Sequence, residues 1–323
     1  MVHLWTRVYN GRDGGLSEKL ARTPSSAMIL PKTILHHYVP DEMEYDESRP
    51  CMQGSMAWII PAKDKSKQYC IKVLRQSAAQ KIHEDIRALN QHAYLATFVN
   101  ASAGKFLRVL AQNLLLEIDL LREKRMGQKV AQAIACLERV DALSYQSRWC
   151  TPDRLVYTYA DGISLATHVP DEPSVSEQIL RVHFHLLWNW NMVQTDPNLG
   201  NFLWRNSTQT LVLIDFGAVV QLDNQSVRLA SFLRKAKDNR ELLSRGFRNE
   251  TLCDVIYKHQ VLLWCDNPVK LTSTTTTLMD VPDLVMAELV PEFASCLRAN
   301  IQVMQLLETL NHTICPGPVL RAV

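Results

Sequence analysis

The fold of this chain is decided by Gln194-Thr195-Asp196-Pro197-Asn198-Leu199-Gly200-Asn201, followed downstream by Ile214-Asp215-Phe216-Gly217. Asp196 precedes Asn201 by five residues and Asp215 by nineteen. Transfer of a phosphoryl group from a nucleotide needs a carboxylate that orients the acceptor and oxygen ligands that hold a divalent metal. The spacing therefore predicts that Asp196 is the orienting carboxylate and that Asn201 and Asp215 bind the metal.

A short β-hairpin is predicted between these two segments. Phe202-Leu203-Trp204 and Leu211-Val212-Leu213-Ile214 are apolar, β-prone runs, and the residues from 205 to 210 between them are polar and turn-like. Asp-Pro-Asn taken alone is ordinary turn chemistry, so the prediction depends on the Asp-Phe-Gly that follows. Such a hairpin would return Asp215 to the neighbourhood of Asn201.

A second hairpin is predicted upstream, and it carries a lysine. Residues 54–60 and 68–73 have the composition of strands, and the polar residues 63–67 join them. Side chains alternate along a strand, so Lys72 would face a cleft while Ile71 faces the opposite way. A lysine in this place can bind nucleotide phosphates, and the alternative is a solvated edge position.

An acidic segment offers this lysine a partner. Glu117-Ile118-Asp119-Leu120-Leu121-Arg122-Glu123 places three acids on one predicted helix, and we expect Glu123 to pair with Lys72. Glu117 and Glu123 are six residues apart and cannot share one direction on an ideal helix, and Asp119 lies on another line. The other interpretation of these acids is an exposed polar face.

Two further places are expected to contact the nucleotide. The first is a loop that lacks Gly-x-Gly-x-x-Gly and is supported by its position before the lysine hairpin. Its expected contacts are Gly54, Ser55, Met56 and Ala57. The second is Tyr159, at the end of a predicted strand over residues 155–160 that Asp161-Gly162 ends with a turn. This turn marks the junction of two lobes.

Helices are predicted over most of the remaining chain. Apolar residues recur every three or four positions from Ala78 to about Val140. Ser174-x-x-Glu177 has the form of a capping box and introduces an apolar helix over residues 179–190, which we expect to lie in a core. Further helical patterns cover about 225–266 and 281–309, and a polar linker at 271–277 separates them.

The composition excludes several classes of protein. The chain has 323 residues, of which 47% are hydrophobic, enough for two lobes with a core. Its 35 basic and 33 acidic residues are mixed along the sequence, so we expect no nucleic-acid partner. No run of eighteen apolar residues occurs, so we expect no transmembrane segment, and we also expect no secretory signal. The first 24 residues weakly resemble an organelle transit segment.

The cysteines and histidines indicate packing and not metal binding. The eight cysteines include no Cys-x-x-Cys pair and are expected to be reduced thiols. His183 and His185 lie two apart on a predicted helix and therefore face different directions. We expect no zinc site.

These motifs together resemble the UbiB family of atypical kinase-like proteins, which is associated with coenzyme Q (ubiquinone) biosynthesis. The sequence Gln-Thr-Asp-Pro-Asn at 194–198 is particularly similar to the corresponding segment of mitochondrial members. The acidic segment resembles the family's acidic helix signature, residues 69–73 its lysine strand, and residues 54–57 its nucleotide loop. Order and approximate spacing agree from about residue 50 to about residue 265.

The resemblance implies a fold and a set of roles. The fold is α+β, a two-lobed protein-kinase-like fold with a small β-containing N-lobe that carries a helical insertion, and a mainly helical C-lobe. Residues 1–50 would be a divergent extension, 51–160 the N-lobe and 161–323 the C-lobe. Lys72 and Glu123 would form the lysine–glutamate pair, Asp196 would be the catalytic aspartate, and Asn201 and Asp215 would bind Mg²⁺ with ATP. Quinone-biosynthesis proteins or lipid-like quinone precursors are the implied partners, and the mitochondrion the implied location, with the cytoplasm as the alternative.

The chain departs from the family pattern in one respect. Family members have a Lys-x-Gly-Gln motif that covers the site and restrains protein-kinase activity. Two acids that correspond to Glu117 and Asp119 of this sequence engage that motif. Residues 1–50 contain no such motif, and Trp58 stands where the family has glutamine. We expect this regulatory element to be missing or rebuilt. A small-molecule phosphotransferase of the aminoglycoside or choline kinase type and a catalytically silent, nucleotide-gated scaffold remain alternative functions.

Overall fold

The computed structural model describes most of the chain. The described residues are 26–54, 56–99, 104, 107–108, 111–112, 115–116, 118–224, 257, 263–270 and 294–323. Most of the helical patterns predicted at 225–266 and 281–309, and the linker at 271–277, lie outside them. Within the described residues, no helix combines the length and the apolar character that crossing a bilayer requires.

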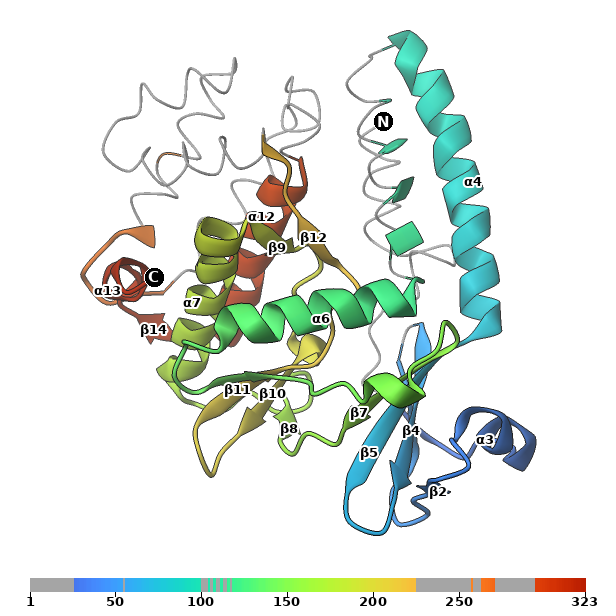
Figure 1. Ribbon diagram of the computed structural model, residues 1–323. Coiled ribbons are helices and arrows are strands. Elements are labelled where there is room, and N and C mark those ends of the chain that lie inside the picture. The colour runs from blue at the N-terminus through green and yellow to red at the C-terminus, as the bar shows by residue number, and fades with distance from the viewer. Residues whose placement is uncertain are drawn as a thin grey trace.

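An antiparallel six-stranded sheet forms the first lobe (Figure 1). Its strands are β1 (Ser26–Met28), β2 (Glu44–Tyr45), β3 (Cys51–Gln53), β4 (Ala57–Lys63), β5 (Gln68–Leu74) and β7 (Arg154–Thr158). The predicted hairpin is the β4–β5 pair, in which Ile59 lies opposite Lys72. Ile71 and Val73 are fully buried in a cluster with Trp149 on one face, so the alternation sends Lys72 to the other face.

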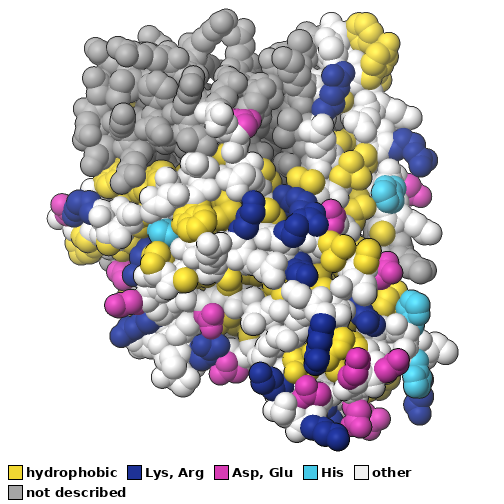
Figure 2. All heavy atoms as spheres, viewed as in Figure 1, with side chains coloured by type: hydrophobic (Ala, Val, Ile, Leu, Met, Phe, Trp, Pro, Cys, Tyr) yellow, Lys and Arg dark blue, Asp and Glu magenta, His cyan; other side chains and the backbone are white. Residues whose placement is uncertain are grey.

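The N-terminal residues contribute to this sheet. β1 pairs with β3 and β2 pairs with β4, and the short helix α3 (Lys32–Tyr38) lies between β1 and β2 in the chain. Strands of two or three residues are too short to show an alternating pattern, which is why the sequence suggested little order before residue 50. Figure 2 shows acidic and basic side chains intermingled over the surface of this lobe.

Two long helices follow β5 and lead to the second lobe. α4 (Gln76–Val99) begins directly after β5, and α6 (Leu120–Ile134) crosses between the sheet and α7 (Pro173–Trp190) (Figure 1). α6 buries Leu120, Glu123, Met126 and Val130 on one face. This spacing of three and four residues is the helical period that the sequence predicted.

The second lobe combines a small sheet with helices. Its four strands are β6 (Val140–Ala142), β11 (Thr210–Leu213), β10 (Phe202–Arg205) and β8 (Ile163–Ser164), in that order. β10 and β11 form the predicted hairpin, with Phe202 opposite Leu213. The short helix η1 (Ser147–Trp149) packs against the first sheet through Trp149. The remaining elements of the second lobe are β9 (Met192–Gln194), η2 (Leu199–Asn201), β12 (Val219–Gln221), β13 (Val269–Lys270), α12 (Ala294–Leu310), β14 (Thr313–Ile314) and α13 (Pro316–Arg321).

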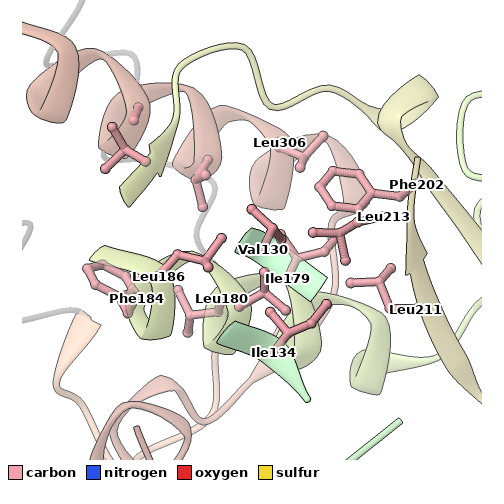
Figure 3. Packing of buried hydrophobic residues seen from close by; sticks show 14 of the residues in the cluster. Val130, Ile134, Ile179, Leu180, Phe184, Leu186, Phe202, Leu211, Leu213 and Leu306 are labelled. Atoms are coloured by element: carbon pink, nitrogen blue, oxygen red, sulfur yellow. The ribbon is translucent and has the colours of Figure 1, made fainter. Parts of the chain in front are cut away.

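The main hydrophobic core joins α6, α7, α12 and the β10–β11 hairpin (Figure 3). The residues of this core in the close view are Val130, Ile134, Ile179, Leu180, Phe184, Leu186, Phe202, Leu211, Leu213 and Leu306. The prediction that residues 179–190 lie in a core is therefore confirmed. This core fixes the base of the hairpin that ends at Asp215.

The predicted capping box at Ser174 is wrong. α7 begins at Pro173, its N-cap is Glu172, and no side chain caps the helix. Proline at the first helical position already has the required φ and lacks the N–H that a cap would bind, so it shifts the start of the helix one residue upstream of Ser174.

Candidate active site

Lys72 and Glu123 form a bidentate ion pair between the sheet and α6. Lys72 Nζ donates to Glu123 Oε1 at 2.8 Å and to Oε2 at 2.9 Å. The side chain of Glu123 is 2% exposed and that of Lys72 is 12% exposed. The structure thus brings together the two residues that the sequence paired, although 51 positions separate them.

The same ammonium group also contacts the second lobe. Lys72 Nζ lies 3.3 Å from Asp215 Oδ2, and Gly217 N donates to Asp215 Oδ1 at 3.0 Å. The Asp215 side chain is 39% exposed, so it is accessible from the cleft side. Lys72 therefore joins three elements: β5, α6 and the segment that follows the β10–β11 hairpin.

Burial and charge act against each other in this cluster. Burial alone would lower the pKa of Lys72, but the carboxylates of Asp215 and Glu123 raise it above its ordinary value. Burial raises the pKa of Glu123 to about 7, and the charge of Asp215 also raises it, while Lys72 opposes both. Lys72 therefore stays cationic, as a phosphate ligand must.

Gln194 connects the Asp196 loop to Asp215, and the sequence did not single it out. Its Nε2 donates to Asp215 O at 3.0 Å, and its Oε1 accepts from Asp196 N at 3.3 Å. One amide side chain thus fixes the spacing of two predicted site residues. Both of its partners are backbone atoms, which a sequence pattern does not show.

Asn201 is held between the same two residues. Its Nδ2 donates to Asp196 O at 2.9 Å, and Ile214 N donates to Asn201 O at 3.0 Å. The hairpin therefore returns Asp215 to Asn201, as predicted. Because the amide nitrogen bonds Asp196, the amide oxygen is left available as a metal ligand.

The donor set at this place fits Mg²⁺. Asp215 offers a carboxylate and Asn201 an amide oxygen, and Mg²⁺ prefers oxygen ligands, with waters and phosphate completing its shell. Within the described part of the chain, no group of three histidine, cysteine or acidic side chains could enclose a metal by itself. A metal at Asp215 and Asn201 would therefore depend on ligands from the nucleotide.

The predicted nucleotide loop is attached to the start of α4. Gly54 N donates to Ala57 O at 2.8 Å, which closes a tight turn, and Arg75 N donates to Met56 O at 3.0 Å. Ser55 lies outside the described residues. The loop thus joins β3 to β4, and β4 pairs with β5, the strand that carries Lys72.

Tyr159 lies at the end of β7 and has an unexpected neighbour. Tyr159 N donates to Gln68 O at 2.9 Å, and the Arg49 guanidinium lies 3.9 Å from the centre of the tyrosine ring. Arg49 also donates to Gln68 Oε1 at 2.8 Å. The N-terminal residues therefore reach the junction of the two lobes, which the sequence did not indicate.

The acidic segment differs from the prediction at its start. Asp119 is the N-cap of α6 and not part of the helix, and its Oδ1 accepts from Arg122 N at 2.8 Å. A short carboxylate at this position satisfies a backbone N–H that the helix leaves free. Glu117 lies outside the described residues.

The two histidines of α7 bind different helices. His183 Nε2 donates to Asn300 Oδ1 of α12 at 2.6 Å, and His185 Nε2 donates to Ala133 O of α6 at 3.0 Å. Both rings are buried. They therefore connect α7 to the helices on either side of it.

Comparison with known proteins places these features in a family. The model of the ABC1 atypical kinase-like domain matches residues 43–241. The mitochondrial atypical kinase COQ8B of Rattus norvegicus is 29% identical over 221 residues, which cover 63% of this chain and 41% of that protein. The chain thus spans about two fifths of the length of this curated relative.

A solved structure shares the fold at low sequence identity. The complex of Rv3197 with erythromycin from Mycobacterium tuberculosis has a TM-score of 0.68 at 14% identity, covering 90% of this chain and 82% of that one. This similarity concerns the fold alone.

Proposed function

This chain belongs to the ABC1 (UbiB-type) family of atypical kinase-like proteins, and we propose that it binds ATP with Mg²⁺ and catalyses phosphoryl transfer or ATP hydrolysis. The family model covers more than half of the chain. The predictions of the family and of a two-lobed protein-kinase-like fold of class α+β are confirmed. The ATP-dependent activity rests on the geometry of the site.

The observation that carries this proposal is the position of Lys72 between Glu123 and Asp215, at 2.8 Å and 3.3 Å. Glu123 holds the lysine in place beside Asp215. The three N–H donors of Lys72 face Glu123 Oε1, Glu123 Oε2 and Asp215 Oδ2, so a phosphate would replace one of these contacts. Lys72 would bind the phosphates, and Asp215 and Asn201 would hold Mg²⁺ next to it. Bound Mg²⁺ would offset the negative charge of the transferred group. Gly54, Ser55, Met56, Ala57 and Tyr159 would surround the rest of the nucleotide.

Asp196 would be the residue that orients the acceptor. It follows β9, and its backbone is fixed by Gln194 on one side and Asn201 on the other. A carboxylate in this position can accept a hydrogen bond from a hydroxyl group or from water and direct its oxygen toward the phosphorus. The two lobes proposed on either side of this site are 51–160 and 161–323, to which the strand pairing adds β1 and β2 on the first side and moves β6 to the second.

The cellular setting that we propose is mitochondrial quinone synthesis. The rat relative is a mitochondrial protein by name, and the family is associated with coenzyme Q. Quinone-biosynthesis proteins or lipid-like quinone precursors would then be the partners. Glu117 and Asp119 would form the regulatory acidic motif.

Replacement of Asp196 tests whether the site turns over nucleotide. In Asp196→Ala, we expect phosphate release to fall by at least a factor of about a hundred, because positioning groups of this kind contribute on that scale, while ATP binding is retained. A coupled phosphate assay and calorimetric titration measure the two quantities. Equal turnover in the variant and the wild type would contradict the role of Asp196, and binding without any turnover in the wild type would favour a nucleotide-gated scaffold.

The acceptor class requires a separate comparison. Phosphate release and product formation are measured with quinone-like phenols, with choline and with an aminoglycoside. Stimulation by the phenols alone is expected. Stimulation by choline or the aminoglycoside alone would assign the protein to the small-molecule phosphotransferases instead.

A further inference from the structure

Arg122 of α6 binds the backbone that follows Asp215. Its Nη1 donates to Gly217 O at 3.0 Å and its Nη2 donates to Val219 O at 2.6 Å. The residue next to it on the helix is Glu123, the partner of Lys72. One guanidinium group thus joins α6, which carries Glu123, to the backbone that follows Asp215.

The segment from Gly217 to Val219 is held from two sides. Its middle carbonyl, that of Ala218, accepts from Thr195 N at 3.0 Å and from Thr195 Oγ1 at 2.9 Å. The carbonyls of Gly217 and Val219 reach α6, while that of Ala218 reaches Thr195 beside the Asp196 loop. A turn closed by Val219 N, which donates to Phe216 O at 3.1 Å, orients them in this way. Pairing of β12 with β9 continues the second attachment.

The attachment of residues 217–219 to α6 depends on a side chain more than their attachment to the Asp196 loop does. The attachment to the Asp196 loop includes a strand pair that belongs to the backbone. The attachment to α6 through Arg122 consists of one side chain. The planar guanidinium can serve two carbonyls at once, and a lysine ammonium cannot reproduce this fork. Asp119, which accepts from Arg122 N, fixes the backbone from which the side chain starts.

We propose that Arg122 is a positioning residue that couples α6 to the metal-binding segment, so that Glu123 and Asp215 keep a fixed separation across Lys72. Its guanidinium bonds two backbone carbonyls and would act on the nucleotide site through them. Its effect on nucleotide binding rests on the proposed ATP and Mg²⁺ function, but the coupling of the two segments does not. Loss of the clamp would loosen the segment after Asp215, while the hydrogen bond of the Phe216 backbone to Glu123, the packing of Phe216 at Gly127 and the fold of each lobe would remain.

Hydrogen exchange of the full chain tests the coupling without any ligand. In Arg122→Ala, we expect amide exchange to increase about tenfold or more in peptides covering residues 215–221 and 119–127, because a charge-assisted clamp of this kind is worth about one factor of ten or more. Arg122→Lys should give an intermediate increase. The control is Arg125→Ala on the same helix, whose side chain is 63% exposed and lies 3.8 Å from Asp119. It should exchange like the wild type.

The Mg²⁺ concentration needed for ATP to stabilise the protein provides a second readout. We expect the half-saturating Mg²⁺ concentration to rise about tenfold in Arg122→Ala, which is about 1.4 kcal/mol, and to stay unchanged in Arg125→Ala. A general loss of stability would lower the melting temperature without moving this concentration.

The outcomes separate this inference from the proposed function. If the wild type shows no Mg²⁺-dependent stabilisation by ATP, the proposed function fails, and the exchange experiment still decides the role of Arg122. Wild-type exchange in Arg122→Ala, or an equal increase in Arg125→Ala, would overturn the coupling.

Discussion

Gly127 is a residue of α6 that packs tightly against the Asp-Phe-Gly segment. A Cβ at this position would lie 2.6 Å from Tyr145 Cε2 and 2.8 Å from Phe216 Cδ2. Gly127 follows Glu123 by four residues and therefore lies on the same face of the helix. Phe216 follows Asp215 directly, so the absence of a side chain at Gly127 permits the approach that puts Glu123 and Asp215 on one lysine.

Replacing this glycine tests the close approach. Alanine forms helices better than glycine by about 1 kcal/mol, but here its methyl group would push apart the buried ring of Phe216 and the partly buried ring of Tyr145, at a cost of about 1–3 kcal/mol. We expect Gly127→Ala to be destabilised and to bind ATP·Mg less tightly. Urea unfolding and calorimetric titration measure both effects, with exposed Gln128→Ala as the control. A more stable Gly127→Ala with wild-type affinity would show that a methyl group fits at this position without displacing the two rings.

At the scale of elements, local patterns were predictable and distant backbone partners were not. The β10–β11 hairpin follows from two apolar runs around a polar turn, and the core face of α7 follows from its apolar period. The roles of Gln194 and Arg122 were not predicted, because each side chain bonds backbone atoms of another segment. Sequence periodicity indicates which residues are buried but not their hydrogen-bond partners. The start of α6 was misplaced for a related reason, since Asp119 can be a helix residue or a cap.

The contact between α7 and α12 predicts how stability depends on pH. Burial lowers the pKa of His183 to about 4, whereas an unfolded histidine titrates near pH 6.5. Between these values the unfolded chain takes up a proton that the folded protein excludes, so stability falls as the pH falls. From pH 6.5 to pH 5 this contribution is about 2 kcal/mol, at 1.36 kcal/mol per pH unit.

The histidine variant isolates this contribution. His183→Gln should lose this part of the slope of unfolding free energy against pH, measured by urea denaturation at several pH values. Exposed His168→Gln should retain the wild-type slope. An unchanged slope in His183→Gln would mean that other groups produce the acid sensitivity.

At the scale of the whole molecule, the site exists only where three parts of the chain meet. β5 supplies Lys72, α6 supplies Glu123 and the end of the hairpin supplies Asp215. The sequence predicted these three residues because their types and order are characteristic of phosphoryl-transfer sites. It could not predict that the N-terminal Arg49 covers Tyr159 at the lobe junction, because the strands that carry the chain there are two or three residues long.

Asp215 is proposed to bind the metal that holds ATP at this site, and Mg²⁺-dependent ATP binding by wild type and Asp215→Asn is the most direct test of that role. ATP at a hundred times its dissociation constant should stabilise the wild type by about 2.7 kcal/mol when Mg²⁺ is present. In Asp215→Asn the Mg²⁺-dependent part should disappear, while Asp153→Asn, which alters an exposed carboxylate, should behave as the wild type. An unchanged Mg²⁺-dependent thermal shift in Asp215→Asn would contradict the account.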